Sequence, residues 1–264
     1  MTAVLGIDAA WTAANDSGFA LIEEISGRWR LIAAASSLRN LAGACDLEPP
    51  KDCGLGFGVV CAKRLLGGRL PDVIAIDMPL SLQPITGRRK SDIAVSSAFG
   101  AAKCSTHSPS AERPGKISQP LHKELKDKGY LLKTLTSPAH PLTLAEIYPH
   151  PALLRLMPAK QRVPYKVSKT KKYWPDASAD ERLQRVREEL RKIVNRLEAV
   201  IAGVMPAVDV DQSQNFTALK PVEDMIDAIV SAWVGTTILG GAAQGYGDGI
   251  STIWIPRDSW AMKH

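Results

Sequence analysis

The alternation of hydrophobic and polar residues predicts three short strands at the start of the chain. Residues 3–8 are apolar up to a closing aspartate, and two further apolar runs follow at residues 17–24 and 28–36. The second and third runs are separated only by a short turn that contains Ser26 and Gly27. Because parallel strands need a long crossover, connections this brief predict an antiparallel meander.

A helix and a parallel strand are predicted next. Residues 55–66 have the pattern of a helix, although Gly56 and Gly58 weaken its start. Residues 73–77 form a β-branched run that is too short for a helix. A helical crossover of this length makes residues 73–77 a parallel neighbour of the first strand.

The second half of the chain is predicted to hold two strands and two long helices. They fall at residues 142–151, 179–204, 221–239 and 249–256. In the first of the two helices, apolar residues recur at i, i+3 and i+4 spacing. Pro149 should halt the strand that begins at residue 142, and Pro221 suits the first turn of the last helix.

Residues 84–141 interrupt this order with an irregular segment. Its middle, at 108–120, is rich in serine, proline and charge, and a helix is predicted over 122–135. We interpret the segment as an insertion over one edge of the sheet, within a single domain that spans residues 1–264. The whole order predicts an α/β ribonuclease H-like fold: one mixed sheet, built of an antiparallel three-strand meander plus parallel strands, with helices on both faces.

Two of the predicted strands end in a lone aspartate, Asp8 in the first and Asp77 in the fourth. In sheets with parallel strands, ligands gather beyond the carboxyl ends, where these two side chains should meet. Paired carboxylates repel each other, and a divalent cation is a common way to offset that repulsion. The alternative is that each aspartate caps a helix or forms a turn.

A second acidic pair, Asp224 and Asp227, lies on the helix predicted over 221–239. Because they are three residues apart, they share one helix face, with Cβ atoms roughly 5–6 Å apart. The apolar residues that follow Asp227 indicate a buried position, where an aspartate is costly unless it is paired or binds a metal. The alternative is that these acids belong to a first helical turn and complement the helix dipole, which fits Glu223 and Asp224 better than Asp227.

Three or four carboxylates from strand ends and a helix suit Mg²⁺ or Mn²⁺ rather than zinc. Two such ions about 3.5–4 Å apart can activate a water and stabilise the leaving oxygen of a phosphodiester. The sequence contains no GxSxG, HExxH or P-loop motif, so chemistry based on those motifs lacks support. The acidic residues therefore predict a metal-dependent nuclease with a two-metal site.

Glu146 and His150 lie near the end of the strand predicted at 142–151. In the functional interpretation, Glu146 joins or supports the metal site, and His150 contacts phosphate or transfers a proton. Two alternatives stay open. Glu146 could pair with Arg88 or Arg89, and His150 could cap the next helix.

Basic residues supply candidate contacts to a nucleic acid. The formal net charge is +6, and much of the excess lies in two short runs. Arg88 and Arg89 closely follow the fourth strand, and arginine can form bidentate contacts to phosphate. Lys169 and Lys171, among interleaved aromatic residues, could follow a strand by charge and stacking. A solubilising surface and a charged loop are the alternatives.

Cysteine usage and hydropathy argue against a secreted or membrane protein. The four cysteines are scattered without a CxxC pair, which predicts reduced thiols in the cytoplasm and no zinc site. The first residues lack the basic lead and apolar core of a signal peptide. No stretch approaches the roughly 20 apolar residues of a membrane span, so no membrane partner is expected.

Four motifs resemble those of domain-of-unknown-function family 429, which is predicted to contain ribonuclease H-like nucleases. They are GIDAAW, IDMPL, AEIYPHPALL and EDMIDAIVSAW, at residues 6–11, 76–80, 145–154 and 223–233. The last motif is also similar to the closing DxxDA pattern of Holliday-junction resolvases. The resemblance implies metal-binding roles for Asp8, Asp77 and Asp227, and less directly for Asp224.

The resemblance also matches Arg89 and Asp92 to the arginine and aspartate that precede a helix of small residues in this family. The prediction is a nuclease that uses Mg²⁺ or Mn²⁺ and acts on DNA or RNA. Its catalytic candidates are Asp8, Asp77, Glu146, Asp224 and Asp227.

Two other function classes fit a ribonuclease H-like core. A non-catalytic binding scaffold of the same fold is the main alternative. A phosphotransferase of the sugar-kinase and actin-like superfamily is less well supported, because that class normally duplicates the core and uses glycine-rich phosphate loops. This chain has the bulky Trp11 where such a loop would need glycine.

Overall fold

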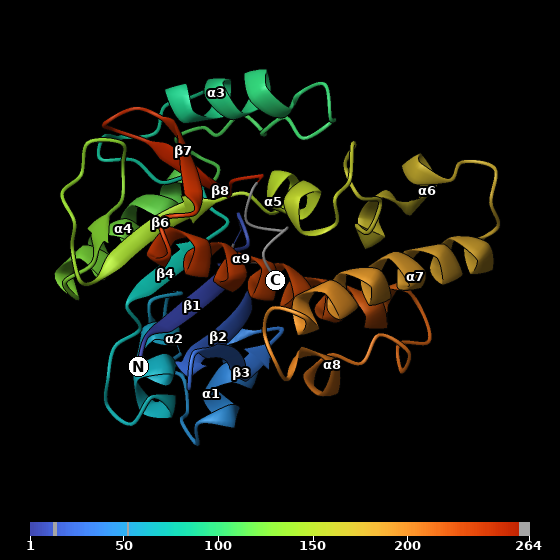
Figure 1. Ribbon diagram of the computed structural model, residues 1–264, viewed down its shortest axis with the longest axis horizontal. Helices are drawn as coiled ribbons and strands as arrows, with labels where there is room; N and C mark the ends of the chain where they lie inside the picture. Colours follow the sequence, from blue (N-terminus) through green and yellow to red (C-terminus); the bar gives the residue numbers. More distant parts are fainter. Residues whose placement is uncertain (13–14, 52, 259–264) are drawn as a thin grey trace.

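The computed structural model describes residues 1–12, 15–51 and 53–258, and its centre is a mixed sheet (Figure 1). Within these residues the strands are β1 (Ala3–Asp8), β2 (Gly18–Ile25), β3 (Arg28–Ala35), β4 (Val73–Ile76), β5 (Leu131–Leu132), β6 (Thr143–Ile147), β7 (Ala243–Gly247) and β8 (Thr252–Pro256). They lie in the order β3-β2-β1-β4-β6-β8-β7, and β5 pairs with β6. β1, β2 and β3 are antiparallel neighbours, whereas β1, β4, β6 and β8 run parallel.

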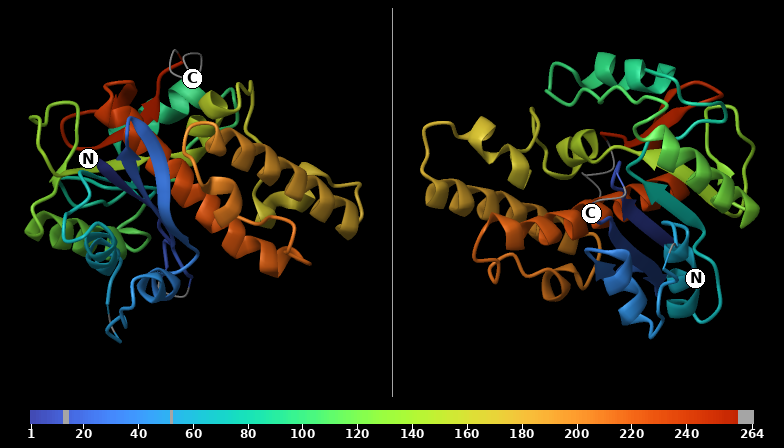
Figure 2. Two further views of the ribbon diagram at one scale, coloured as in Figure 1. Left: turned by 60° about the horizontal axis from the view of Figure 1, so that its bottom comes forward. Right: turned by 180° about the vertical axis from the view of Figure 1, so that it is seen from behind.

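Helices cover both faces of the sheet (Figure 2). The described helices are α1 (Leu38–Ala44), α2 (Phe57–Leu65), α3 (Lys90–Phe99), α4 (Gly115–Asp127), α5 (Pro149–Leu156), the 3₁₀ helix η1 (Val167–Lys169), α6 (Thr170–Tyr173), α7 (Ala179–Glu198), α8 (Val204–Ala207) and α9 (Phe216–Leu239). Buried residues of α5, α7 and α9 pack on one face, and those of α1, α2 and α4 pack on the other. This arrangement confirms the predicted ribonuclease H-like mixed sheet.

The segment at 84–141 contains α3, α4 and β5, so the single helix predicted over 122–135 is wrong. α4 ends at Asp127 because Gly129, two residues later, takes a φ of 94°, a left-handed conformation that ends helices. Tyr130 is then buried, and the chain enters the sheet as β5. α3 packs against β7 and β8, so part of the segment does cover an edge of the sheet.

Pro149 lies at the start of a helix, whereas Pro221 lies inside one. β6 ends at Ile147 and Pro149 opens α5, which confirms that the strand does not continue past Pro149. Pro221 lies inside α9 rather than in its first turn, because the helix begins at Phe216. The Asn215 side chain caps that start by accepting a hydrogen bond from the Ala218 N–H at 2.9 Å.

The long helix α9 lies directly on the backbones of β1 and β2. A Cβ atom at Gly6 would lie 2.1 Å from the Ala228 carbonyl oxygen, and one at Gly18 would lie 2.2 Å from the Asp224 carbonyl oxygen. Only glycine permits so close an approach. The two glycines therefore set the helix that carries Asp224 and Asp227 against the strand that ends in Asp8.

The structure describes the character of the helices and the state of the cysteines. None of the helices in the described part of the chain combines the length and the apolar character needed to cross a membrane. Cys45, Cys53, Cys61 and Cys104 are free thiols, and all but Cys53 are buried.

Replacing Gly6 by alanine should destabilise the fold strongly. We expect the free energy of unfolding to fall by about 3 kcal/mol, because β1 or α9 must move to accommodate the methyl group. Gly43→Ala is the matched control, since Gly43 lies in α1 and has no atom within 4 Å of an added Cβ. That change should stabilise the protein by about 0.5 kcal/mol. Urea denaturation measures both variants, and equal stabilities would contradict the close packing of α9 on β1.

Candidate functional site

The carboxyl ends of β1 and β4 bring Asp8 and Asp77 side by side. Ile7 and Ile76 are paired in the parallel register, and the Asp77 N–H donates to the Ile7 carbonyl at 2.9 Å. Among the residues that the structure describes, neither carboxylate has a hydrogen-bond or ion-pair partner. Two neighbouring acids are therefore left without a direct counter-charge.

Asp227 of α9 is fully buried, and both of its carboxylate oxygens have partners. The Tyr165 hydroxyl donates to Oδ1 at 2.6 Å, and the Lys166 ammonium forms an ion pair with Oδ2. Lys166 also pairs with Glu223, one turn earlier in α9, at 3.2 Å. Lys166 thus bridges two buried carboxylates and ties the segment before η1 to α9.

Glu223 is only 1% exposed, and it does not lie in the first turn of α9 as the alternative had it, because the helix begins at Phe216. Its Oε2 accepts the Val167 N–H at 2.6 Å, and its Oε1 pairs with Lys220 at 3.1 Å. Lys220 also forms an ion pair with Asp224, which lies nearer the rim. Glu223 and Asp224 therefore share the cation of Lys220, and neither carboxylate is left without a positive partner.

Burial and mutual repulsion disfavour the charged forms of the strand-end acids. Burial raises the pKa of Asp77 to about 7; Lys166 opposes the rise and Asp227 adds to it. Burial, followed by the charge of Asp227, also raises the pKa of Asp8 well above its ordinary value. Burial acts to lower the pKa of Lys166, but Asp227 and the neighbouring acids outweigh it and raise that pKa. Additional positive charge beside Asp8 and Asp77 would be favourable.

Arg89 forms a second buried charge network with Glu146 and Asp92. Its guanidinium contacts the two Glu146 oxygens at 2.6 and 2.7 Å, and the two Asp92 oxygens at 2.8 and 3.0 Å. It also donates to the Leu80 carbonyl at 2.7 Å, and the Leu80 N–H donates to Glu146 at 2.8 Å. All three guanidinium nitrogens have partners, so Arg89 fixes the loop between β4 and α3. The pairing of Glu146 with Arg89 is the alternative that the sequence raised to a place for Glu146 in the metal site.

His150, in the first turn of α5, lies beside Arg162. The Arg162 guanidinium donates to Nε2 of His150, and the rings of Tyr148 and Tyr165 approach the imidazole at 5.3 and 5.7 Å. His150 does not cap the helix as the alternative predicted, because Tyr148 is the N-cap residue of α5. Burial, followed by the positive charge of Arg162, lowers the pKa of His150 well below its ordinary value, so the ring is neutral.

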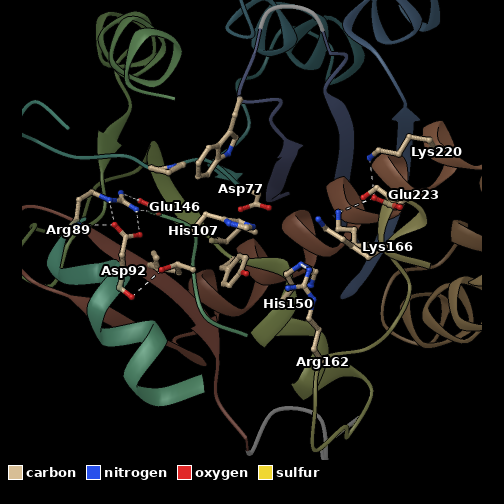
Figure 3. Close-up of a pocket in the computed structure, with 18 residues that line it drawn as sticks. Asp77, Arg89, Asp92, His107, Glu146, His150, Arg162, Lys166, Lys220 and Glu223 are labelled. Carbon is tan, nitrogen blue, oxygen red and sulfur yellow. Dashed lines mark hydrogen bonds and ion pairs between the residues drawn. The ribbon is translucent and has the colours of Figure 1, made fainter. Parts of the chain in front are cut away.

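Two adjoining hollows open beside these residues, and Figure 3 shows the side chains that line the smaller one. A groove of about 1390 Å³ contains Asp8 and Asp224, and a chamber of about 250 Å³ contains His150, Arg162 and the Arg89 network. Both hollows are lined by Trp11, Asp77, His107, Lys166, Lys169 and Lys220. Asp77 therefore lies at the boundary between the groove and the chamber.

The predicted basic contacts take different positions. Lys169 lines both hollows, whereas Lys171 is an exposed residue of α6. Arg88 donates to the Ser108 hydroxyl and to the Asp92 carbonyl, each at 3.2 Å, which ties it to α3 and to the loop beyond that helix. Lys169 is thus the predicted basic contact with the most direct access to the acidic site.

Sequence reasoning missed the partners of the acids. Lys166 belongs to the basic run at 166–172, whose two interpretations were a nucleic-acid contact and a charged loop, and Lys220 and Arg162 lie outside that run. The available signal was the alternation of Val163, Tyr165 and Val167, which are all buried. It indicates that the segment packs against the core, but it does not identify which acid Lys166 meets.

The donor set limits how a metal ion can bind. Within residues 1–12, 15–51 and 53–258, no three Asp, Glu, His or Cys side chains are grouped so that they could hold an ion together. Asp227 is engaged by Tyr165 and Lys166, which leaves the adjacent pair Asp8 and Asp77. Mg²⁺ often takes one or two carboxylates and keeps several waters. The pair therefore fits one hydrated Mg²⁺ or Mn²⁺.

Together, the fold and this site define an α/β protein of the ribonuclease H-like class with an acidic centre at the carboxyl edge of its sheet. The chain belongs to the family described as protein of unknown function (DUF429), whose family model matches residues 6–250. This match confirms the family resemblance carried by the four motifs. No curated protein matches the chain.

The raised pKa of Asp77 makes stability depend on pH. Between pH 4 and pH 7 the folded chain keeps the Asp77 proton that the unfolded chain loses, so this group lowers stability as pH rises through that window. Asp77→Asn removes this effect. The variant should have a free energy of unfolding roughly 1 to 2 kcal/mol higher than that of the wild type at pH 8, and nearly the same value at pH 4.5. The gain is smaller than the full pKa shift implies, because solvent screens the partly exposed side chain. Urea denaturation in EDTA at the two pH values measures it.

The matched control is Asp127→Asn, at an exposed residue that pairs with Lys123 at 3.0 Å. Its effect should stay below about 0.5 kcal/mol at both pH values. A variant Asp77→Asn that is less stable than the wild type at pH 8 would show that the carboxylate has a stabilising partner.

Proposed function

We propose that the protein is a metal-dependent nuclease that hydrolyses phosphodiester bonds of DNA or RNA. The observation that carries this proposal is the pair of adjacent, unpartnered carboxylates, Asp8 and Asp77, on the wall of a groove with basic residues. Burial and the charge of Asp227 raise the pKa of both acids, so their charged forms destabilise the fold unless a cation relieves them, and a divalent ion does so. A polyanion would in turn be attracted by the lysines around the groove.

In this proposal Asp8 and Asp77 hold one hydrated Mg²⁺ or Mn²⁺. Such an ion, when bound, polarises a phosphate oxygen and makes a water more nucleophilic. Lys166 would offset the negative charge that develops on the phosphate, because its ammonium lines the groove and the chamber beside Asp77. Asp227, Glu223 and Tyr165 keep that ammonium in place.

Other groove residues would hold the strand. Lys169 and Lys220 line the groove with Arg113, and they supply positive charge along a backbone path. The Trp11 ring at the shared wall offers a surface on which a base can stack. Arg89 and Glu146 act indirectly in this proposal, by fixing the loop that begins at Asp77.

The two-metal site predicted from the sequence stays a prediction. Asp227 would have to release Lys166 before it could join a second ion, because both of its oxygens are engaged. We therefore propose that one ion binds first, between Asp8 and Asp77. The ammonium of Lys166 takes the place that a second cation would have beside Asp227.

The second candidate function is a non-catalytic scaffold that binds nucleic acid. The observation that favours it is the lack, among the described residues, of any group of three side chains suited to holding a metal ion.

We also propose a cytoplasmic setting, because the four cysteines are free thiols and three of them are buried.

The nuclease proposal predicts that Asp8→Asn and Asp77→Asn each lose Mn²⁺-dependent cleavage while keeping the fold. We expect a fall of roughly a hundredfold or more, the scale of one lost electrostatic contact to a transition state. The measurement is cleavage of labelled single-stranded, duplex and hybrid DNA and RNA, with circular dichroism as the check on folding. Asp127→Asn, on the exposed end of α4, is the control and should cleave like the wild type.

Cleavage that survives in both active-site variants would refute the site. Wild-type protein that binds these nucleic acids but cuts none of them would instead support the scaffold.

A further inference from the structure

The chamber next to Asp77 contains a positive group that no acid neutralises. Arg162 lines the chamber, and within the described residues its guanidinium forms no ion pair with a carboxylate. Its guanidinium donates to the imidazole of His150, which carries no charge, and it also lies beside the Tyr173 hydroxyl. By contrast, Arg89, the buried arginine of the chamber, is fully engaged by Glu146 and Asp92.

The orientation of the His150 ring adds a second unsatisfied group. Because Nε2 accepts a hydrogen bond from Arg162, a neutral imidazole must carry its proton on Nδ1. His150 is only 7% exposed, and its Nδ1 is buried without a hydrogen-bond partner in the described part of the chain. A buried donor without an acceptor is costly, and an acceptor on a ligand would relieve the cost.

The rest of the chamber suits one nucleotide. Trp11 and His107 meet edge to face at 6.3 Å on the wall shared with the groove, and Tyr148 supplies a further ring. Pro79 and Ile253 add apolar surface. The volume of about 250 Å³ is small for a continuing duplex but sufficient for a terminal residue.

The acidic centre and the unpaired arginine lie at two ends of one path. Asp77 lines both hollows, and Figure 3 shows the labelled side chains of His150 and Arg162 below it in the chamber. Tyr148 lines the same chamber as Asp77 and Arg162. A strand with its scissile phosphate beside Asp77 would therefore send its end toward Arg162.

We propose that the chamber binds the terminal phosphomonoester of a nucleic-acid strand, through the Arg162 guanidinium and the Nδ1–H of His150. This inference rests on the proposed nuclease function and adds a preference for strand ends. A phosphomonoester carries more negative charge than an internal phosphodiester, so a partly buried arginine without an acidic partner distinguishes the two. The site explains why Arg162 is held by a neutral histidine rather than by an acid.

Binding in EDTA tests the inference apart from cleavage. Fluorescence anisotropy compares one ten-nucleotide single strand in three forms, with a 5′-phosphate, with a 3′-phosphate and with two hydroxyl ends. We expect one phosphorylated form to bind the wild type about tenfold more tightly than the hydroxyl form, and the two phosphate arms identify which end enters. Equal affinity for all three forms would overturn the inference.

Variants of the two side chains locate the effect. Arg162→Met should abolish the preference to within about twofold, and Arg162→Lys should keep part of it. His150→Phe, which keeps an aromatic ring but removes both ring nitrogens, should weaken the preference. Arg185→Met, at an exposed arginine of α7, is the matched control and should keep the full preference. A preference that survives in folded Arg162→Met would assign the phosphate to another site and overturn the inference.

Cleavage scored separately with Mn²⁺ distinguishes this inference from the proposed function. Metal-dependent cleavage without an end preference would overturn the chamber's role and leave the nuclease intact. An end preference that depends on Arg162, without cleavage under any metal, would support the chamber and refute the nuclease. A wild type that binds none of the three strands would overturn the inference, while the nuclease proposal would still be decided by the cleavage assay.

Discussion

The site depends on how closely α9 lies on β1 and β2. Where Gly6 and Gly18 lack side chains, the helix backbone approaches the strands until an added Cβ would lie little more than 2 Å from a carbonyl oxygen. This contact carries Asp227 into the interior, next to the carboxyl ends of the parallel strands. A side chain at Gly6 or Gly18 would force α9 and the strands apart, and it would move Asp227 relative to Asp8 and Asp77.

That packing creates a charge imbalance, which accounts for the chemistry we assign to the site. Lys166 neutralises Asp227 and shares Glu223 with Lys220, while Asp8 and Asp77 have no direct partner. An uncompensated acidic pair costs stability in the absence of a cation. The same pair becomes useful if a divalent ion binds. On this account a metal relieves the repulsion that the fold imposes on its strand ends.

Much of the fold could be predicted because it is encoded in local patterns. The brief connections between the first three apolar runs allow only antiparallel pairing. The parallel register of β1 and β4 then places Asp8 and Asp77, at the ends of these strands, side by side. Elements governed by single residues were harder to predict. Gly129 ends α4 early and Asn215 starts α9 early, and neither changes the hydrophobic periodicity. The five acidic candidates could be found because they lie in or beside apolar runs, whereas the partners of Lys166 and Arg162 are fixed only by tertiary contacts.

The most direct test of the central claim is a calorimetric titration of the wild type with Mn²⁺ at pH 8, beside Asp8→Asn/Asp77→Asn. The account predicts one ion per wild-type chain and no binding by the double variant, because Asp227 is already paired with Lys166. Two ions per chain, binding that survives in the double variant, or no binding by the wild type even with an uncleavable oligonucleotide present would contradict it.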